Sequence, residues 1–169
     1  MCAPQLPSST YLNGLLGALH QQSDQPRTFH IPVFVSHSWS YPQHYDTIAD
    51  WLFGNRWQSN GNPIAFADAS VPKSNPIHYA PNEGTLRVAI YERIAAASVV
   101  IIPTGMYSSH SKWIRKEIDG AHLFGKPILA VNPWGQERKC SVVVEASRLH
   151  VGWNKQSVVN GIWRLSGHG

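Results

Sequence analysis

Short apolar runs alternate with amphipathic stretches along most of this chain. Nearly continuous runs are typical of strands buried on both faces of a parallel sheet, whereas apolar residues three and four positions apart predict helices. Strands are predicted at Phe29–Val35, Ile64–Ala67, Ser98–Ile102, Ile128–Val131 and Leu149–Trp153. Helices are predicted at Gln43–Trp57, Leu86–Ala97, Ser108–Phe124 and after the capping residue Asn154, and Ser141–Ser147 fits either a short helix or a strand. This alternation predicts a flavodoxin-like α/β fold, a five-stranded parallel sheet flanked by about five helices.

One carboxylate contradicts the amphipathic pattern of the helix predicted at Ser108–Phe124. An advance of roughly 100° per residue places an apolar arc on one side of this helix. The arc consists of Trp113, Ile114, Ile118, Ala121 and Phe124. Glu117 lies in the middle of the arc, while the other charged side chains lie opposite. Because a buried unpaired charge is costly, Glu117 is expected either to bond a hydroxyl or a loop amide, or to line a cavity where it takes part in chemistry.

Polar residues directly follow two of the predicted strands. Ser36, His37 and Ser38 come after the first strand, and Asp68 and Ser70 come after the second. Ligand sites in open α/β sheets lie at the carboxyl ends of the strands, so these residues are candidates for a binding site. Strand-to-helix turns with capping hydroxyls explain the first cluster equally well.

The chain is expected to form one domain preceded by an appendage. A length of 169 residues suits a single domain with a sizeable core. Residues 1–28 are rich in Ser, Gln and Pro and contain one short predicted helix, and residues 29–169 form the predicted domain. The sequence shows neither a signal-peptide layout nor a run of about 18 apolar residues, so a cytoplasmic protein without a membrane span is expected.

Composition narrows the classes of ligand. A net charge of +4 and a pI near 9.2 suit an anionic ligand, but the basic residues are not clustered as nucleic-acid binding requires. The two cysteines, Cys2 and Cys140, lie far apart in the sequence and predict neither a disulfide framework nor a zinc site. The nine histidines never occur as His-Glu-x-x-His or beside cysteine ligands, so no bound metal is expected.

Several familiar catalytic motifs are absent from the sequence. Neither Gly-x-Gly-x-x-Gly nor Gly-x-x-x-x-Gly-Lys-Ser/Thr occurs, so both common phosphate-binding loops are missing. The Gly-x-Ser-x-Gly of serine hydrolases is also missing. A phosphoacceptor receiver domain needs an aspartate at the end of its third strand, where this chain has Pro103.

Six segments, each at the proper strand end, form an ordered set: Val33–Trp39, Phe66–Ser70, Ile94–Ile102, Ser111–Ile118, Gly125–Ile128 and Val151–Asn154. Together they resemble the bacterial and archaeal TIR-like family of the Thoeris defence systems. The resemblance spans about residues 31 to 165, nearly the whole chain after the appendage. It implies a flavodoxin-like TIR fold, whose enzymatic members cleave the bond between nicotinamide and ribose in NAD and often cyclise the ADP-ribose into a signal.

The resemblance also implies roles for individual residues. The glutamate of the family's Trp-x-x-x-Glu segment is matched by Glu117, which is expected to be catalytic, and its tryptophan by Trp113. A carboxylate suits NAD cleavage because departure of nicotinamide leaves an oxocarbenium-like ribose that negative charge stabilises. The expected substrate-binding residues are Ser36, His37, Ser38, Trp39, Asp68, Ser70 and Trp113, with Trp39 as a stacking surface and Trp113 serving either packing or stacking. NAD is expected as the substrate, and no cofactor is expected.

Three functions remain open at this point. The first is an NAD-consuming TIR enzyme (NAD glycohydrolase or ADP-ribosyl cyclase) that self-associates, responds to a phage-derived trigger and signals to a separate effector protein through its nucleotide product. The second is a non-catalytic TIR-like adaptor that acts by self-assembly or partner binding. The third is an enzyme like the nucleoside deoxyribosyltransferases, which also use a glutamate. The buried position predicted for Glu117 favours an enzyme, and the Trp-x-x-x-Glu segment favours the first function.

Overall fold

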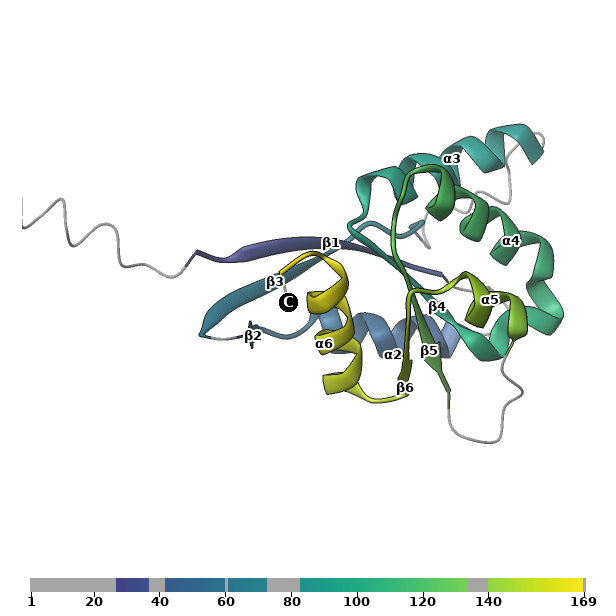
Figure 1. Ribbon diagram of the computed structural model, residues 1–169. Helices are drawn as coiled ribbons and strands as arrows, with labels where there is room; N and C mark the ends of the chain where they lie inside the picture. Colours follow the sequence, from purple (N-terminus) through teal and green to yellow (C-terminus); the bar gives the residue numbers. More distant parts are fainter. Residues whose placement is uncertain (1–26, 37–41, 60, 73–82, 134–139, 169) are drawn as a thin grey trace, which may run out of the picture.

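The computed structural model describes residues 27–36, 42–59, 61–72, 83–133 and 140–168. Within them, six strands form one sheet in the order β2-β3-β1-β4-β5-β6 (Figure 1). The strands are β1 (Phe29–Val35), β2 (Trp57–Ser59), β3 (Asn62–Asp68), β4 (Val99–Pro103), β5 (Ile128–Asn132) and β6 (Leu149–Gly152). All neighbouring strands pair in parallel except β2, which pairs with β3 in the antiparallel sense. The parallel strands therefore follow the flavodoxin-like order, in which the first strand lies between the second and the third.

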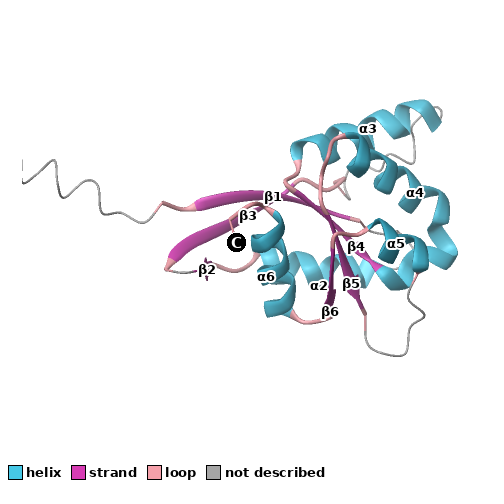
Figure 2. Cartoon of the chain, in the orientation of Figure 1, coloured by secondary structure: helices cyan, strands magenta, loops and turns pink. Residues whose placement is uncertain are grey.

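Helices cover both faces of the sheet. They are α2 (Pro42–Phe53), α3 (Glu83–Ala96), α4 (Tyr107–Leu123), α5 (Ser141–Ala146) and α6 (Lys155–Leu165), with the short 3-10 helix η2 (Thr104–Met106) before α4. Figure 2 shows α3, α4 and α5 on one side of the sheet and α2 and α6 on the other. Two apolar cores result, one under each group of helices. The alternation of strand and helix predicted this layered architecture.

The central strands β1, β4 and β5 position the rest of the molecule. Every residue of β4 is buried, as are Val33, Phe34 and Val35 of β1. Successive side chains point to opposite faces, so Phe34 enters the core under α3 and α4 while Val33 and Val35 enter the core under α2 and α6. Uninterrupted apolar runs are required because each of these strands is covered on both faces.

Three details differ from the sequence-based expectations. The helix predicted to reach Trp57 ends at Phe53, and Trp57 instead begins β2, so the sheet has six strands in the described residues rather than five. Gly61, with φ of 77°, allows the turn that folds β2 back onto β3. Phe124 was assigned to the buried arc of α4, but it lies past the end of that helix, is 40% exposed and makes a T-shaped contact with the Tyr91 ring.

The structure decides between the alternatives for the segment after residue 140 and confirms the expected cap of the last helix. The ambiguous segment after residue 140 is the short helix α5, and the Asn154 side chain caps α6 by accepting a hydrogen bond from the Ser157 amide at 3.0 Å. The helix predicted within residues 1–28 lies outside the described residues. No helix in the described part of the chain is long and apolar enough to cross a membrane.

Candidate functional site

The topology creates one natural place for a ligand, at the carboxyl ends of β1 and β4. These neighbouring strands are parallel, but the chain leaves β1 toward α2 on one face of the sheet and leaves β4 toward α4 on the other face. Divergent connections of this kind define the topological switch point, called the crevice below, at which open α/β sheets bind their ligands. Ser36, the residue after β1, is tied to this place by its amide, which donates to the Ile101 carbonyl of β4 at 2.8 Å.

A buried hydroxyl and a buried carboxyl meet at this crevice. The Ser36 hydroxyl donates a hydrogen bond to Oε2 of Glu117, across 81 positions of sequence. Both side chains are buried, with exposed fractions of 2% and 6%. Glu117 projects from the face of α4 that also carries the buried Ile114 and Ile118, as the amphipathic pattern predicted. The structure thus gives Glu117 a hydroxyl partner, which was one of the two alternatives for an acid in an apolar arc.

Burial determines the ionisation of this carboxyl. Removal from water raises the pKa of Glu117 from an ordinary 4.5 to about 8, and the hydrogen bond from Ser36 opposes part of that rise. Desolvation dominates because the charged form loses its hydration, while a single hydroxyl donor restores only part of it. The group therefore changes charge close to neutral pH. Acids tuned in this way occur at catalytic sites, although buried structural acids share the property.

A second polar cluster lies at the end of β3, next to β1. Asp68 accepts a hydrogen bond from the Tyr45 hydroxyl of α2 on Oδ2 and one from the Ser70 amide on Oδ1 at 2.8 Å. The buried Ser70 hydroxyl accepts from the Val35 amide at 2.9 Å. Because Val35 immediately precedes Ser36, this hydroxyl joins the second cluster to the strand end that carries the Ser36–Glu117 pair.

Tyr45 is a site residue that the sequence reading missed. It is half-buried, and its pKa is raised above the ordinary value, first by burial and then by its hydrogen bond to the Asp68 carboxylate. Its phenol therefore remains a hydrogen-bond donor at physiological pH. Tyr45 shares a helix face with the buried Ile48 and Leu52, three and seven positions later, and this spacing was the available signal.

The remaining candidate residues have different positions. Trp113 lies one turn before Glu117, is half-buried and packs against the core under α3 and α4. That contact fits the packing alternative for its ring. His37, Ser38 and Trp39 lie outside the described residues, so their expected contacts stay predictions.

Two further polar residues lie at the next strand ends. The buried Thr104 hydroxyl donates to Oδ1 of Asn132 at 3.1 Å, which links the end of β4 to the end of β5. The Thr104 carbonyl accepts from the Cys140 amide at 3.2 Å. No local sequence pattern pairs Thr104 with Asn132, because 28 positions separate them. No group of His, Cys, Asp and Glu side chains in the described ranges could hold a metal ion.

Comparison with protein families gives a match that includes five of the six segments wholly or in part, while Val151–Asn154 lies beyond it. The model of the family described as "Thoeris protein ThsB, TIR-like domain" matches residues 34–138, more than half of the chain. The matched region begins in β1 and includes Ser36, Asp68, Ser70 and Glu117. No curated protein matches the sequence significantly.

Two solved structures show a distant likeness in fold. A 2-deoxyribosyltransferase from Bacillus psychrosaccharolyticus superposes with a TM-score of 0.48 at 11% identity, covering 76% of this chain and 90% of that one. The CMP N-glycosidase BcmB from Clostridium botulinum superposes with a TM-score of 0.45 at 14% identity, covering 78% of this chain and 97% of that one. At these scores the likeness carries no argument about function.

Proposed function

This chain belongs to the family of the TIR-like domain of the Thoeris protein ThsB, and we propose that it is an enzyme that cleaves the bond between nicotinamide and ribose in NAD. Family membership indicates a role in Thoeris antiphage defence. The proposal of NAD cleavage is carried by one observation, the buried Ser36–Glu117 pair at the crevice between β1 and β4. In this reaction, a carboxylate held among apolar side chains can stabilise the positive charge that develops on the ribose.

The reaction begins when the carbon–nitrogen bond to nicotinamide breaks. Nicotinamide leaves as a neutral molecule with the bonding electron pair, and positive charge develops on the ribose carbon and ring oxygen. A negative carboxylate close to that carbon stabilises this charge, most effectively where water is excluded. In the proposal Glu117 supplies the carboxylate, and Ser36 fixes its direction through the hydroxyl that bonds Oε2.

The raised pKa of Glu117 is compatible with this role. The carboxyl is largely neutral at pH 7 in the empty site, because its pKa is about 8. NAD carries a positive charge on its nicotinamide ring, and an opposite charge nearby favours the ionised carboxylate. Substrate binding therefore helps to generate the charged form that the developing ribose cation requires.

The reaction ends when an acceptor atom attacks the ribose carbon. Water as acceptor yields ADP-ribose and releases a proton to the solvent, whereas attack by an atom of the ADP-ribosyl group itself yields a cyclic product. We propose that Asp68 and Ser70 hold polar groups of the substrate beside Ser36, and that the product activates a separate effector protein. NAD is the substrate in this scheme, and no cofactor takes part.

In the proposed function, copies of the chain associate with one another, and a phage-derived trigger activates them. Three large apolar side chains are exposed: Val88 within α3, Leu123 at the end of α4 and Phe124 just after it, with exposed fractions of 55%, 66% and 40%. These side chains support association between copies. Sedimentation velocity should show larger species as concentration rises, and Leu123→Ser should shift the distribution toward the monomer.

Release of nicotinamide tests the proposed reaction. The purified full chain, with lysate of phage-infected cells as a source of trigger, is incubated with NAD, and nicotinamide is measured by chromatography while mass spectrometry identifies the nucleotide product. We expect turnover that falls by a factor of about 100 or more in Glu117→Gln. Glu92→Gln, a change at an exposed acid of α3, is the matched control and should keep full activity. Full activity in Glu117→Gln contradicts the mechanism, whereas defence that survives Glu117→Gln in cells indicates an adaptor.

A further inference from the structure

A small pocket lies at the edge of the sheet opposite to the crevice. Its volume is about 300 Å³, and it is lined by Arg148, Leu149, Arg164, Leu165 and Gly167. Leu149 is the first residue of β6, and Leu165 is the last residue of α6, which runs back along the sheet after β6 ends. The pocket is therefore near the amino ends of the strands, whereas the Ser36–Glu117 pair lies at their carboxyl ends.

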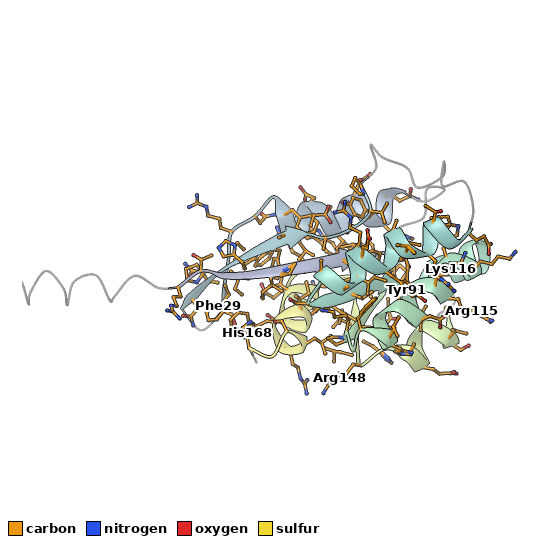
Figure 3. All side chains as sticks on the ribbon, turned by 90° about the horizontal axis from the view of Figure 1, so that it is seen from above. Phe29, Tyr91, Arg115, Lys116, Arg148 and His168 are labelled. Carbon is orange, nitrogen blue, oxygen red and sulfur yellow. The ribbon has the colours of Figure 1, made fainter. Side chains whose placement is uncertain are left out.

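Secondary structure at or beside each residue positions the backbone of both arginines in this pocket. The Arg148 amide donates to the Ile128 carbonyl at the start of β5 at 2.9 Å, which anchors the backbone just before β6. Arg164 lies in the last turn of α6, next to the 8%-exposed Trp163. Figure 3 shows the Arg148 side chain at the surface on the side of the molecule that carries α6. Both arginines line the same cavity from different parts of the chain.

These positive charges are not neutralised by the protein. In the described part of the chain, no carboxylate forms an ion pair with Arg148 or Arg164, and both side chains are exposed. The carbonyls at the end of α6 would disfavour an anion, but two of them are already occupied. The Ser166 amide donates to the Ile162 carbonyl at 2.9 Å, and the Ser166 hydroxyl donates to the Trp163 carbonyl at 3.0 Å. The pocket is therefore electropositive.

The other residues that line the pocket are two leucines and a glycine. Leu149 and Leu165 are half-buried and present aliphatic surface. Gly167 has a φ of 83°, which lets the chain turn back beside the cavity without a side chain. A volume of about 300 Å³ is at the lower limit of ordinary small-molecule sites. The occupant should therefore combine a compact anion with a small apolar part.

We propose that this pocket binds the phosphate group of a small phosphate monoester. A guanidinium offers parallel N–H donors that match two phosphate oxygens, and a monoester carries nearly two negative charges near pH 7, which suits two arginines better than one carboxylate does. The aliphatic walls formed by Leu149 and Leu165 accept the organic part of the ester. The site is separate from the proposed NAD site because it lies at the other end of the strands.

Titration calorimetry of the full chain with phenyl phosphate tests this site at constant ionic strength. Phenyl phosphate should bind the unaltered chain, and inorganic phosphate should bind with lower affinity because it lacks the ring. Phenol alone should not bind. The double variant Arg148→Gln/Arg164→Gln should weaken binding of phenyl phosphate by a factor of about 10 or more, since two charge-assisted contacts are lost.

Matched variants separate this proposal from the proposed enzyme. Arg93→Gln changes an exposed arginine of α3 far from the pocket and should leave binding unchanged. Glu117→Gln should also bind phenyl phosphate normally, whether or not the chain cleaves NAD. Thermal unfolding without ligand verifies that the double variant is folded, and each single variant should show a partial loss. Equal affinity in the double variant and the unaltered chain, or absence of binding at millimolar phenyl phosphate, overturns the proposal.

Discussion

Glu117 depends on its immediate surroundings for its charge. Apolar neighbours on α4 remove it from water, and the Ser36 hydroxyl is the hydrogen-bond donor that the structure shows at Oε2. Because of the raised pKa, the folded state keeps a proton on Glu117 between about pH 4.5 and about pH 8, where the unfolded chain has already released it. The contribution of Glu117 to protein stability therefore falls across that interval, because ionising the buried group costs more than ionising it in the unfolded chain.

Unfolding at several pH values measures this cost. In the unaltered chain, the contribution of Glu117 to the free energy of unfolding is fully present below about pH 4.5 and is lost as pH rises to about 8. Glu117→Gln cannot ionise, so its stability should fall less than that of the unaltered chain between pH 5 and pH 8. Urea unfolding at these pH values provides the comparison. If the free energy of unfolding depends on pH in the same way in both proteins, the Glu117 carboxyl has an ordinary pKa.

Removing the Ser36 hydroxyl should raise the pKa of Glu117 further, because the hydrogen bond from Ser36 is the contact that lowers it. We expect Ser36→Ala to reduce kcat/KM for NAD at pH 7 by a factor of about 10, the equivalent of one charge-assisted hydrogen bond. The loss should shrink at higher pH as the carboxyl ionises. Ser98→Ala is the control, since the hydroxyl of Ser98 makes no hydrogen bond in the described residues. A loss that is the same at every pH assigns Ser36 a purely structural role.

At the scale of single residues, the sequence predicted the unusual acid but not its partner. Glu117 was visible because it interrupts an apolar arc, and Ser36 was visible because it follows an apolar strand. The hydrogen bond between them spans 81 positions and depends on how α4 packs against the sheet. No local sequence pattern carries that information. The bond between Tyr45 and Asp68 was missed for the same reason.

Contacts between elements hold the strand ends in place. Tyr45 connects α2 to the end of β3 through Asp68, and Thr104 connects the end of β4 to β5 through Asn132. On the same face as α2, α6 approaches β5 closely at Gly161, where an added Cβ would lie 3.0 Å from Cδ1 of Leu129. These contacts explain why the elements around the crevice keep a fixed register.

The link between α2 and β3 can be tested with Tyr45→Phe. This change deletes the hydroxyl that donates to Asp68 and keeps the ring in the core. We expect a loss of about 1 kcal/mol in the free energy of unfolding, typical of one hydrogen bond. Tyr91→Phe is the matched control, because the Tyr91 hydroxyl has no hydrogen bond in the described residues. Equal stability of the two variants would contradict a structural role for the Tyr45 hydroxyl.

The packing of α6 on the sheet can be tested with Gly161→Ala. Alanine favours a helix by about 1 kcal/mol over glycine, but its methyl group would press on the fully buried Leu129. Overpacking costs about 1–3 kcal/mol, so we expect a lower melting temperature. Gly152→Ala is the control, since an added Cβ there meets nothing within 4 Å. An increase in the melting temperature of Gly161→Ala would mean that Leu129 can move aside.

Strands and helices were predicted correctly where the apolar pattern extends over many residues. The boundaries of β1 agree fully, because its apolar run ends abruptly at Ser36. Strand β2 was missed because its residues, Trp57–Ser59, have no alternation of their own and form a strand only by pairing with β3 after the turn at Gly61. Short edge strands depend on their partner, so single-segment patterns do not reveal them.

At the scale of the whole molecule, the order of the strands determines where chemistry can occur. The connections from β1 and β4 diverge, and the buried acid lies where they do so. The flavodoxin-like fold followed from the sequence because strands and helices alternate, and the Thoeris family followed from segments near these strand ends. The arginine pocket at the opposite edge was not predicted, since Arg148 and Arg164 come together only when α6 returns along β6.

The pH dependence of NAD cleavage tests the central claim most directly. The rate of nicotinamide release at low NAD gives kcat/KM, which reports the ionisation of groups in the free enzyme. If the Glu117 carboxylate stabilises the ribose cation, kcat/KM should rise with pH and level off above a pKa near 8. Glu117→Gln should give a low rate without this rise. A profile for the unaltered chain that stays flat from pH 6 to pH 9 would contradict the assignment of Glu117 as the carboxylate that acts in the reaction.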